Sequence, residues 1–129
     1  MATLENAYIE KILNDIQDMK EVSDGARDLA CAYTHSKRNG FDILVMAYTL
    51  WPKNAESFAE EMHRSGIRDL YFTHEGSNMF QTYMTLSEGG LKLRGVVRIE
   101  NATFRLDMAR YGESSEEPHL LALKFSFDD

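Results

Sequence analysis

Apolar residues form two runs in the middle of the chain, and a helical pattern separates them. The first run covers residues 43–51, where Thr49 is the only polar residue. An unbroken apolar run of this length is typical of a strand buried on both faces. The second run lies at residues 67–72 and contains four apolar residues. The pattern therefore predicts a strand, a helix and a second strand over residues 42–73.

An amphipathic helix is predicted between these two strands. Asn54 is a favoured N-cap residue, and Gly66 can adopt the left-handed conformation at which many helices end. Apolar residues recur at three- and four-residue spacing and form one face: Ala55, Phe58, Ala59 and Met62. A helix that joins neighbouring strands of one sheet makes a right-handed crossover, so we predict that the two strands are parallel.

Two helices are predicted before this βαβ unit. In the first, apolar residues recur at helical spacing after a possible cap at Thr3: Leu4, Tyr8, Ile9, Ile12, Leu13, Ile16 and Met19. The second begins after Ser23 and ends near the pair Asn39 and Gly40. We expect both apolar faces to pack on the protein's own core. Pairing of the first helix with a second copy, to give a homodimer, is the alternative.

The C-terminal half shows short alternating runs, which predict strands. They are Phe80, Met84 and Leu86; then Leu91, Leu93, Val97 and Ile99; then Phe104, Leu106 and Met108; and last Leu121, Leu123, Phe125 and Phe127. The pair Gly89 and Gly90 predicts a hairpin turn between the first two. We predict an α+β fold over residues 1–129, in one domain. Two N-terminal helices, the βαβ unit and an antiparallel meander would form one mixed sheet of about six strands, with helices mainly on one face.

The composition narrows the classes of partner. The net charge of −7 opposes direct binding to nucleic acid and to anionic membranes, and it favours a basic protein partner. No apolar stretch reaches the roughly 20 residues that a membrane-spanning helix needs. The single cysteine, Cys31, permits no internal disulfide, and no segment resembles a signal peptide. We therefore expect a cytoplasmic protein.

Acidic side chains suggest the favoured function. They gather on the predicted central helix at Glu56, Glu60 and Glu61, and in a loop at Glu113, Glu116 and Glu117. Carboxylates on both segments would form a docking surface for a basic protein. The prediction is a small acidic interaction protein without enzymatic activity, such as an inhibitor or a phage-type immunity protein. Its partner would be a basic protein that handles nucleic acid.

A second hypothesis uses the loops that follow the two parallel strands, because ligands bind at that edge of such sheets. The first loop contains Trp51, Lys53 and Asn54, and the second contains His74, Glu75 and Ser77. If the loops converge, His74 or Glu75 would move a proton and Lys53 would neutralise an oxyanion. This arrangement would make a small enzyme or a ligand-binding domain.

A third hypothesis is a binder of single-stranded nucleic acid. Lys92, Arg94 and Arg98 are predicted to project from one side of a strand, and Arg105 would join them from its neighbour. Polar residues are also expected on any solvated strand face, and the net charge favours that simpler interpretation.

No motif predicts a cofactor or a metal. The chain has no phosphate loop, dinucleotide fingerprint, nucleophile elbow or calcium loop. Cys31 and His35 are four residues apart on a predicted helix, a spacing that suits one metal ion or a thiol–imidazole pair. Further ligands at a sensible spacing are lacking, so we interpret Cys31 as a buried structural cysteine and His35 as a surface histidine.

Overall fold

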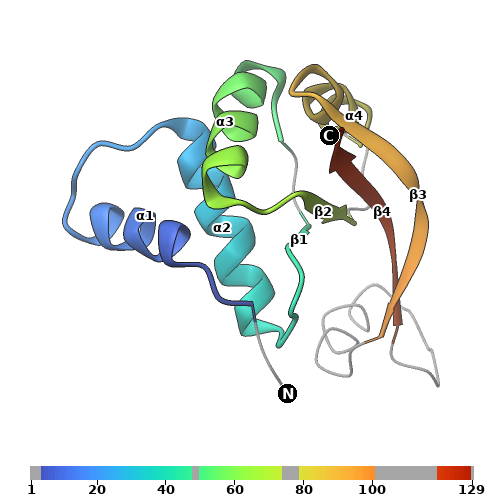
Figure 1. The fold of residues 1–129 in the computed structure, drawn as a ribbon, viewed down its shortest axis with the longest axis horizontal. Helices are drawn as coiled ribbons and strands as arrows, with labels where there is room; N and C mark the ends of the chain where they lie inside the picture. Colours follow the sequence, from blue (N-terminus) through green and yellow to red (C-terminus); the bar gives the residue numbers. More distant parts are fainter. Residues whose placement is uncertain (1–3, 48–49, 74–78, 101–118, 129) are drawn as a thin grey trace.

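The computed structural model describes residues 4–47, 50–73, 79–100 and 119–128. Its α-helices are α1 (Ala7–Gln17), α2 (Asp24–Arg38), α3 (Ala55–Ser65) and α4 (Met79–Glu88), with a short 3-10 helix, η1, at Pro52–Asn54. Its strands are β1 (Val45–Met46), β2 (Asp69–Phe72), β3 (Leu91–Glu100) and β4 (His119–Phe127). The sheet order is β1-β2-β4-β3, and α1 lies on the outer side of α2 and α3, away from the sheet (Figure 1). The predicted α+β fold with one mixed sheet is confirmed.

The main hydrophobic core lies between the helices and one face of the sheet. Residues of all four helices contribute to it, and Leu70, Phe72, Phe125 and Phe127 contribute from the strands. A smaller cluster contains Phe41, Val45, Ile99 and Ala122, and none of these four lies in a helix. The helices therefore cover mainly one face, as predicted, while the opposite face is also partly apolar.

The central βαβ unit forms as predicted. β1 and β2 are parallel, with Val45 opposite Tyr71 and Met46 opposite Phe72. Met46 enters the main core and Val45 the smaller cluster, so β1 is buried on both faces. Gly66 ends α3 at a positive φ of 81°. β1 is nevertheless only two residues long, much shorter than the apolar run that predicted it.

A helix side chain completes the hydrogen bonding of β1. Ser36 of α2 is fully buried, and its Oγ accepts a hydrogen bond of 2.8 Å from the backbone N–H of Val45. The same hydroxyl lies 2.8 Å from the carbonyl of Ala32 and 3.1 Å from that of Val45, and it donates to one of them. A buried backbone N–H without an acceptor is costly. Ser36 therefore hydrogen-bonds the backbone at the outer edge of β1, where a neighbouring strand would otherwise do so.

Side-chain caps define where the helices begin. Ser23 caps α2 as predicted, through a 3.1 Å hydrogen bond from the N–H of Ala26. The cap of α1 is Asn6, whereas the predicted cap Thr3 lies outside the described residues. Asn6 also donates from Nδ2 to the carbonyl of Ser65 at 2.9 Å, which ties α1 to the end of α3. Asn54 is the N-cap residue of α3, as predicted, but its side chain makes no cap hydrogen bond.

The segment predicted as a strand around Phe80, Met84 and Leu86 is the helix α4, and the two glycines after it do not form a hairpin turn. The buried residues of α4 include Thr82, Thr85 and Leu86, which share a helical face, whereas Phe80 is 79% exposed and Met84 50% exposed. Two threonines hold positions where apolar residues were expected. The alternation of apolar residues that predicted a strand therefore came largely from the solvent side of the helix.

Hydroxyl groups explain why α4 buries threonine. Thr82 Oγ1 accepts a 2.9 Å hydrogen bond from the backbone N–H of Leu50, and Thr85 Oγ1 lies 3.0 Å from the carbonyl oxygen of Leu50. Thr85 donates its single hydrogen either to that carbonyl or to the carbonyl of Gln81, at 2.8 Å. Leu50 is fully buried. α4 therefore supplies hydrogen-bonding groups to Leu50, a buried residue that lies in none of the described strands.

A β-bulge divides β3 into two parts that face opposite ways. Leu93 pairs with Phe125 on β4, but Gly95 pairs with Lys124, so one residue is unpaired between them. Odd-numbered residues before the bulge consequently point to one face of the sheet, and odd-numbered residues after it point to the opposite face. The prediction that Leu91, Leu93, Val97 and Ile99 share one side is wrong. The strand predicted at residues 104–108 lies outside the described residues.

Gly25 sets the distance between α2 and α3. A Cβ atom at this position would lie 2.2 Å from both Ser57 Oγ and the backbone nitrogen of Phe58. The Gly25 N–H instead donates to Ser57 Oγ at 2.7 Å. We predict that Gly25→Ala lowers the free energy of unfolding by about 1–3 kcal/mol, because the two helices must move apart.

Urea unfolding followed by circular dichroism checks this prediction. Ser87→Ala, at an exposed position of the helix α4, is the control and should change stability little. An unchanged midpoint for Gly25→Ala would contradict the close packing.

Thr82→Val tests the hydrogen bond between α4 and Leu50. Valine keeps the shape of threonine but has no hydroxyl, so the buried Leu50 N–H would lose its acceptor. We expect a loss of about 1–3 kcal/mol of unfolding free energy in the same assay. A loss no larger than that of Ser87→Ala would show that water or another group replaces the hydroxyl.

Candidate functional site

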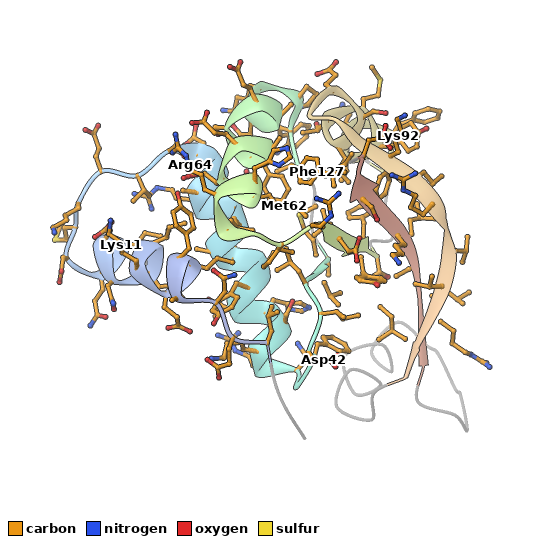
Figure 2. All side chains as sticks on the ribbon, in the orientation of Figure 1. Lys11, Asp42, Met62, Arg64, Lys92 and Phe127 are labelled. Atoms are coloured by element: carbon orange, nitrogen blue, oxygen red, sulfur yellow. The ribbon has the colours of Figure 1, made fainter. Side chains whose placement is uncertain are left out.

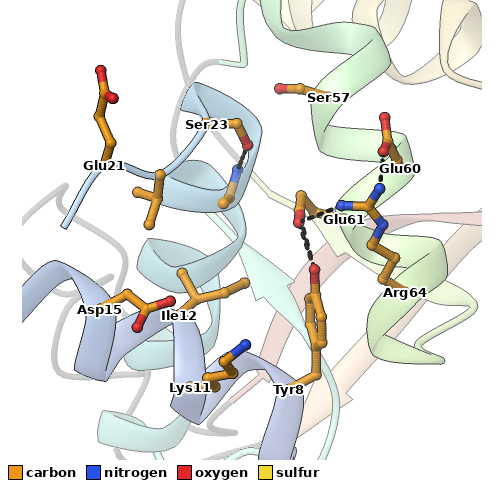
Figure 3. A pocket seen from close by; sticks show the side chains of 12 residues that line it. Tyr8, Lys11, Ile12, Asp15, Glu21, Ser23, Ser57, Glu60, Glu61 and Arg64 are labelled. Atoms are coloured by element: carbon orange, nitrogen blue, oxygen red, sulfur yellow. Dashed lines mark hydrogen bonds and ion pairs between the residues drawn. The ribbon is translucent and has the colours of Figure 1, made fainter.

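A polar pocket of about 300 Å³ lies between α1, the start of α2 and α3 (Figure 3). Its walls contain four carboxylates and two cations, together with hydroxyl and apolar groups. The lining residues are Tyr8, Lys11, Ile12, Asp15, Glu21, Val22, Ser23, Ala26, Ser57, Glu60, Glu61 and Arg64. A volume of this size is at the lower end of the range for ligand pockets, about 300–1,000 Å³.

A hydrogen-bonded pair of side chains joins the two sides of the pocket. The hydroxyl of Tyr8 on α1 donates to Glu61 on α3, with O–O distances of 2.6 Å to Oε1 and 3.0 Å to Oε2. Glu61 is only 7% exposed. Burial, followed by the hydrogen bond to Glu61, raises the pKa of Tyr8 above its ordinary value, so the phenol stays protonated and remains a donor.

Arg64 partly balances the acidic groups of α3. It forms an ion pair with Glu60 and lies 3.5 Å, Nη1 to Oε1, from Glu61. On α1, Asp15 lies 3.9 Å from Lys20 in an exposed and therefore weak ion pair. With six charged residues in its lining, the pocket has a formal charge of −2, from four acids and two bases. The pocket therefore has an excess of negative charge, which favours a cationic ligand.

The hydroxyl groups of the pocket are occupied by structural hydrogen bonds. Ser57 Oγ accepts from the Gly25 N–H, and Ser23 Oγ accepts from the Ala26 N–H. Within the described part of the chain, neither serine is hydrogen-bonded to a histidine or carboxylate base, and no histidine lines the pocket. In the described ranges, no three side chains of His, Cys, Asp or Glu gather closely enough to hold a metal ion. The arrangement supports recognition of a cation better than catalysis.

The structure separates the predicted acidic surface into exposed and buried members. Glu56 and Glu60 are exposed on α3, as a docking surface requires. Glu61 is buried and hydrogen-bonded to Tyr8, so it was wrongly assigned to an open surface. The loop residues Glu113, Glu116 and Glu117 lie outside the described residues.

Only one half of the second predicted site is described. Trp51 is 43% exposed and Lys53 is exposed, whereas Asn54 is nearly buried and donates from Nδ2 to Asp28 at 2.9 Å. Burial raises the pKa of Asp28, and the hydrogen bond from Asn54 opposes this effect. His74, Glu75 and Ser77 lie outside the described residues, so the predicted convergence of the two loops stays a prediction.

The bulge in β3 divides the predicted nucleic-acid face. Lys92 is opposite Ser126 and Arg98 is opposite Leu121 on the continuous strand β4, so the two cations point to opposite faces of the sheet. The prediction that they project from one side is therefore wrong. Arg105 lies outside the described residues.

Part of this positive charge is also neutralised within the chain. Lys92 and Arg94 both form ion pairs with Asp128, the latter at 2.9 Å. Their hydrogen bonds lower the pKa of the Asp128 carboxyl below its ordinary value, with Lys92 contributing most. Both observations weaken the case for a nucleic-acid surface on this strand.

Cys31 and His35 lie on the other side of α1 from the polar pocket, in a groove between α1 and α2. Cys31 is exposed, which corrects its interpretation as a buried structural residue. His35 is half-buried rather than a fully exposed surface histidine.

Tyr8 and Glu21 are pocket residues that the sequence did not single out. Tyr8 belongs to the apolar stripe of α1, so its spacing indicated a core residue, and its partner Glu61 is 53 positions away. Glu21 lies in the connection between two helices, where acidic residues are common. A tyrosine within an apolar stripe was the one available signal, because a buried hydroxyl needs a hydrogen-bond partner.

The family of the chain follows from one comparison. A family model described as "Domain of unknown function (DUF7698)" matches residues 28–126. The chain belongs to this family. The match includes the α3 side of the pocket and leaves out α1 with Tyr8, Lys11 and Asp15. Neither a curated protein nor a solved structure gives a significant match. Within the described ranges, every helix is too short or too polar to cross a bilayer.

Tyr8→Phe tests the hydrogen bond that joins α1 to α3. The variant leaves the buried Glu61 without its hydroxyl donor, and we expect a loss of about 1–3 kcal/mol of unfolding free energy near neutral pH. Tyr71→Phe is the control, because its hydroxyl makes no hydrogen bond within the described part of the chain.

The same comparison has a defined pH dependence. A raised pKa in the folded state means that the stabilising contribution is complete below the unfolded pKa of about 10 and is lost as pH rises through the folded pKa. Urea unfolding of wild type and Tyr8→Phe should therefore differ most near neutral pH and converge above pH of about 10. A difference that persists unchanged at high pH would contradict the assignment.

Proposed function

We propose that this protein is a small, non-enzymatic interaction protein that binds a basic protein partner through the acidic pocket between α1 and α3. The partner would be a protein that handles nucleic acid, and the binding would inhibit it or confer immunity against it. The pocket with four carboxylates is the observation that carries this proposal. The net charge of −7 would also speed association with a basic partner.

The geometry of the pocket favours a side chain over a free metal ion. Its carboxylates come from three segments: Asp15 from α1, Glu21 from the connection before α2, and Glu60 and Glu61 from α3. Figure 3 shows these groups spaced around an open cavity rather than converging on one point. A lysine or arginine side chain of a partner can enter such a cavity and lie among the carboxylates. Arginine is enriched among the residues that dominate interface energies.

The pocket is also held in shape before any partner arrives. Tyr8 and Glu61 bridge α1 to α3, and Ser57 receives the N–H of Gly25 across the narrow contact between α2 and α3. Binding to a preformed pocket avoids the entropy cost of ordering side chains. The rim carboxylates Glu21 and Glu60 are exposed and can pair with further cations around the central one.

Charge is arranged unevenly over the molecule in a way that favours one orientation. Figure 2 shows Lys11 and Arg64 on the helices that flank the pocket, and Lys92 on the outer strand at the opposite side of the view. The pocket side has a formal charge of −2 and would attract a basic partner, whereas Lys92 and Arg94 on β3 already pair with Asp128. Long-range electrostatics would therefore orient the encounter before contact.

Partner capture with a matched pair of variants tests this function. Immobilised wild-type protein is incubated with a host lysate at low salt, and bound proteins are identified by mass spectrometry. The variant Glu21→Lys/Glu60→Lys reverses two pocket charges. The control Asp42→Lys/Glu88→Lys makes the same change in net charge at two exposed residues outside the pocket.

Wild type and control should both recover a basic protein, and the pocket variant should bind it at least about tenfold more weakly. Purified partner titrated by calorimetry supplies the affinities, and its activity with and without the protein reports inhibition. Recovery of no basic protein, or equal loss in both variants, would contradict the proposal.

A further inference from the structure

A second cavity, of about 430 Å³, lies in a groove on the other side of α1, between α1 and α2. Its floor is apolar. Leu13 and Ile16 of α1 pack against the main core and stay partly exposed, and Ala30 of α2 is a buried member of that core. Partly exposed apolar side chains beside a small residue leave a concave surface that a partner can cover, with a gain in hydrophobic free energy.

The charges of the groove are the reverse of those in the acidic pocket. Arg27 and Arg38 line it, and no carboxylate does. Neither arginine forms an ion pair with any residue that the structure describes. On a chain with a net charge of −7, an apolar groove bordered only by positive charge is a local exception that favours an acidic ligand.

The spacing of the two arginines indicates what length of ligand fits. They are on the same helix, in the first and last turns of α2. A rise of 1.5 Å per residue separates them by about 16 Å along the helix axis. The residues of α2 that line the groove between them, including Cys31 and Thr34, follow helical spacing over three turns. The lining residues of α2 therefore form a stripe along that helix, with a positive charge at each end.

We propose that this groove binds an acidic amphipathic helix of another protein. The apolar face of that helix would lie on Leu13, Ile16 and Ala30. Carboxylates about three turns apart on the same helix would pair with Arg27 and Arg38. An amphipathic helix in a groove between two helices is a recurrent mode of peptide recognition. A small anionic molecule would reach only one of the two arginines, since Arg27 and Arg38 are about 16 Å apart along α2.

This inference concerns a surface separate from the acidic pocket. Both cavities are lined by α1 and α2, but they share no lining residue. The failure of one proposal therefore leaves the other intact, and the variants below should still bind the basic partner.

Binding of designed helices to the full chain tests the proposal. The probe is a panel of fluorescent, side-chain-stapled peptides of about 18 residues, long enough to hold a helix when stapled. Each has leucines at three- and four-residue spacing and two glutamates placed three turns apart, in several registers. Matched peptides carry lysine in place of glutamate. Fluorescence anisotropy should show binding by glutamate peptides and at least about tenfold weaker binding by their lysine counterparts.

Two double variants locate the binding. Arg27→Glu/Arg38→Glu should weaken binding of the best glutamate peptide by about tenfold or more, since two pairs are lost and repulsion is added. Lys20→Glu/Lys53→Glu changes the net charge equally at residues that line neither cavity and should bind like wild type. Circular dichroism and urea unfolding establish that both variants are folded.

Cys31 reports directly on occupation of the groove. It is the only cysteine of the chain and is exposed, so a thiol reagent modifies this site alone and no cysteine has to be introduced or removed. The bound peptide should protect Cys31 from alkylation in wild type, and this protection should be lost in the arginine variant.

Several results would overturn the proposal. These are no binding by any peptide of the panel, binding without protection of Cys31, and equal binding by the arginine variant. Loss of Cys31 reactivity on raising the protein concentration without peptide would instead place a second copy in the groove. Protection by a fatty acid at concentrations where the peptides do not bind would identify an anionic amphiphile as the ligand.

Discussion

The need to hydrogen-bond buried backbone groups governs the architecture of this protein. β1 has only two residues, and Leu50, four residues after it, is buried but lies in none of the described strands. Neither finds all its partners in the sheet. Ser36 of α2 accepts the N–H of Val45, and Thr82 of α4 accepts that of Leu50. Helix hydroxyls thus replace strand partners, and they fix how α2 and α4 sit against the sheet.

These hydrogen bonds from helix hydroxyls also determine how the helices pack on one another. Because β1 is bound to α2 at its outer edge, α2 lies deep in the molecule, and α3 packs against it at Gly25 with no space for a side chain. α1 is then left on the outside, held through Asn6 to α3 and through Tyr8 to Glu61. A helix attached on the outside of two others has a groove along each flank. The polar pocket and the apolar groove arise in this way.

The two flanks of α1 differ in chemistry, and this difference gives the protein its distinct surfaces. One flank is polar and contains four carboxylates, and the other is apolar with an arginine at each end. The sheet contributes a third region, where the bulge before Gly95 turns Lys92 and Arg98 to opposite faces. A run of basic residues in the sequence is consequently dispersed in space. Carboxylates that are distant in the sequence are gathered instead.

The sequence by itself determined the elements whose signals are local. Helical spacing of apolar residues, the cap at Ser23 and the left-handed Gly66 predicted α2 and α3, and an unbroken apolar run predicted a strand buried on both faces. These features depend on residues that are close together in the sequence. They also depend on how apolar a segment is, and the sequence shows both.

Only the tertiary structure decided the features that depend on residues far apart. α4 was predicted as a strand because its buried face contains threonines, whose partner Leu50 is more than 30 positions away. The bulge reverses a face by one unpaired residue, which alternation cannot reveal. Glu61 is a surface residue by its helical spacing, yet Tyr8 makes its burial possible. The environment of the Glu61 carboxylate depends on its hydrogen-bond partner, and that partner, Tyr8, is on another helix.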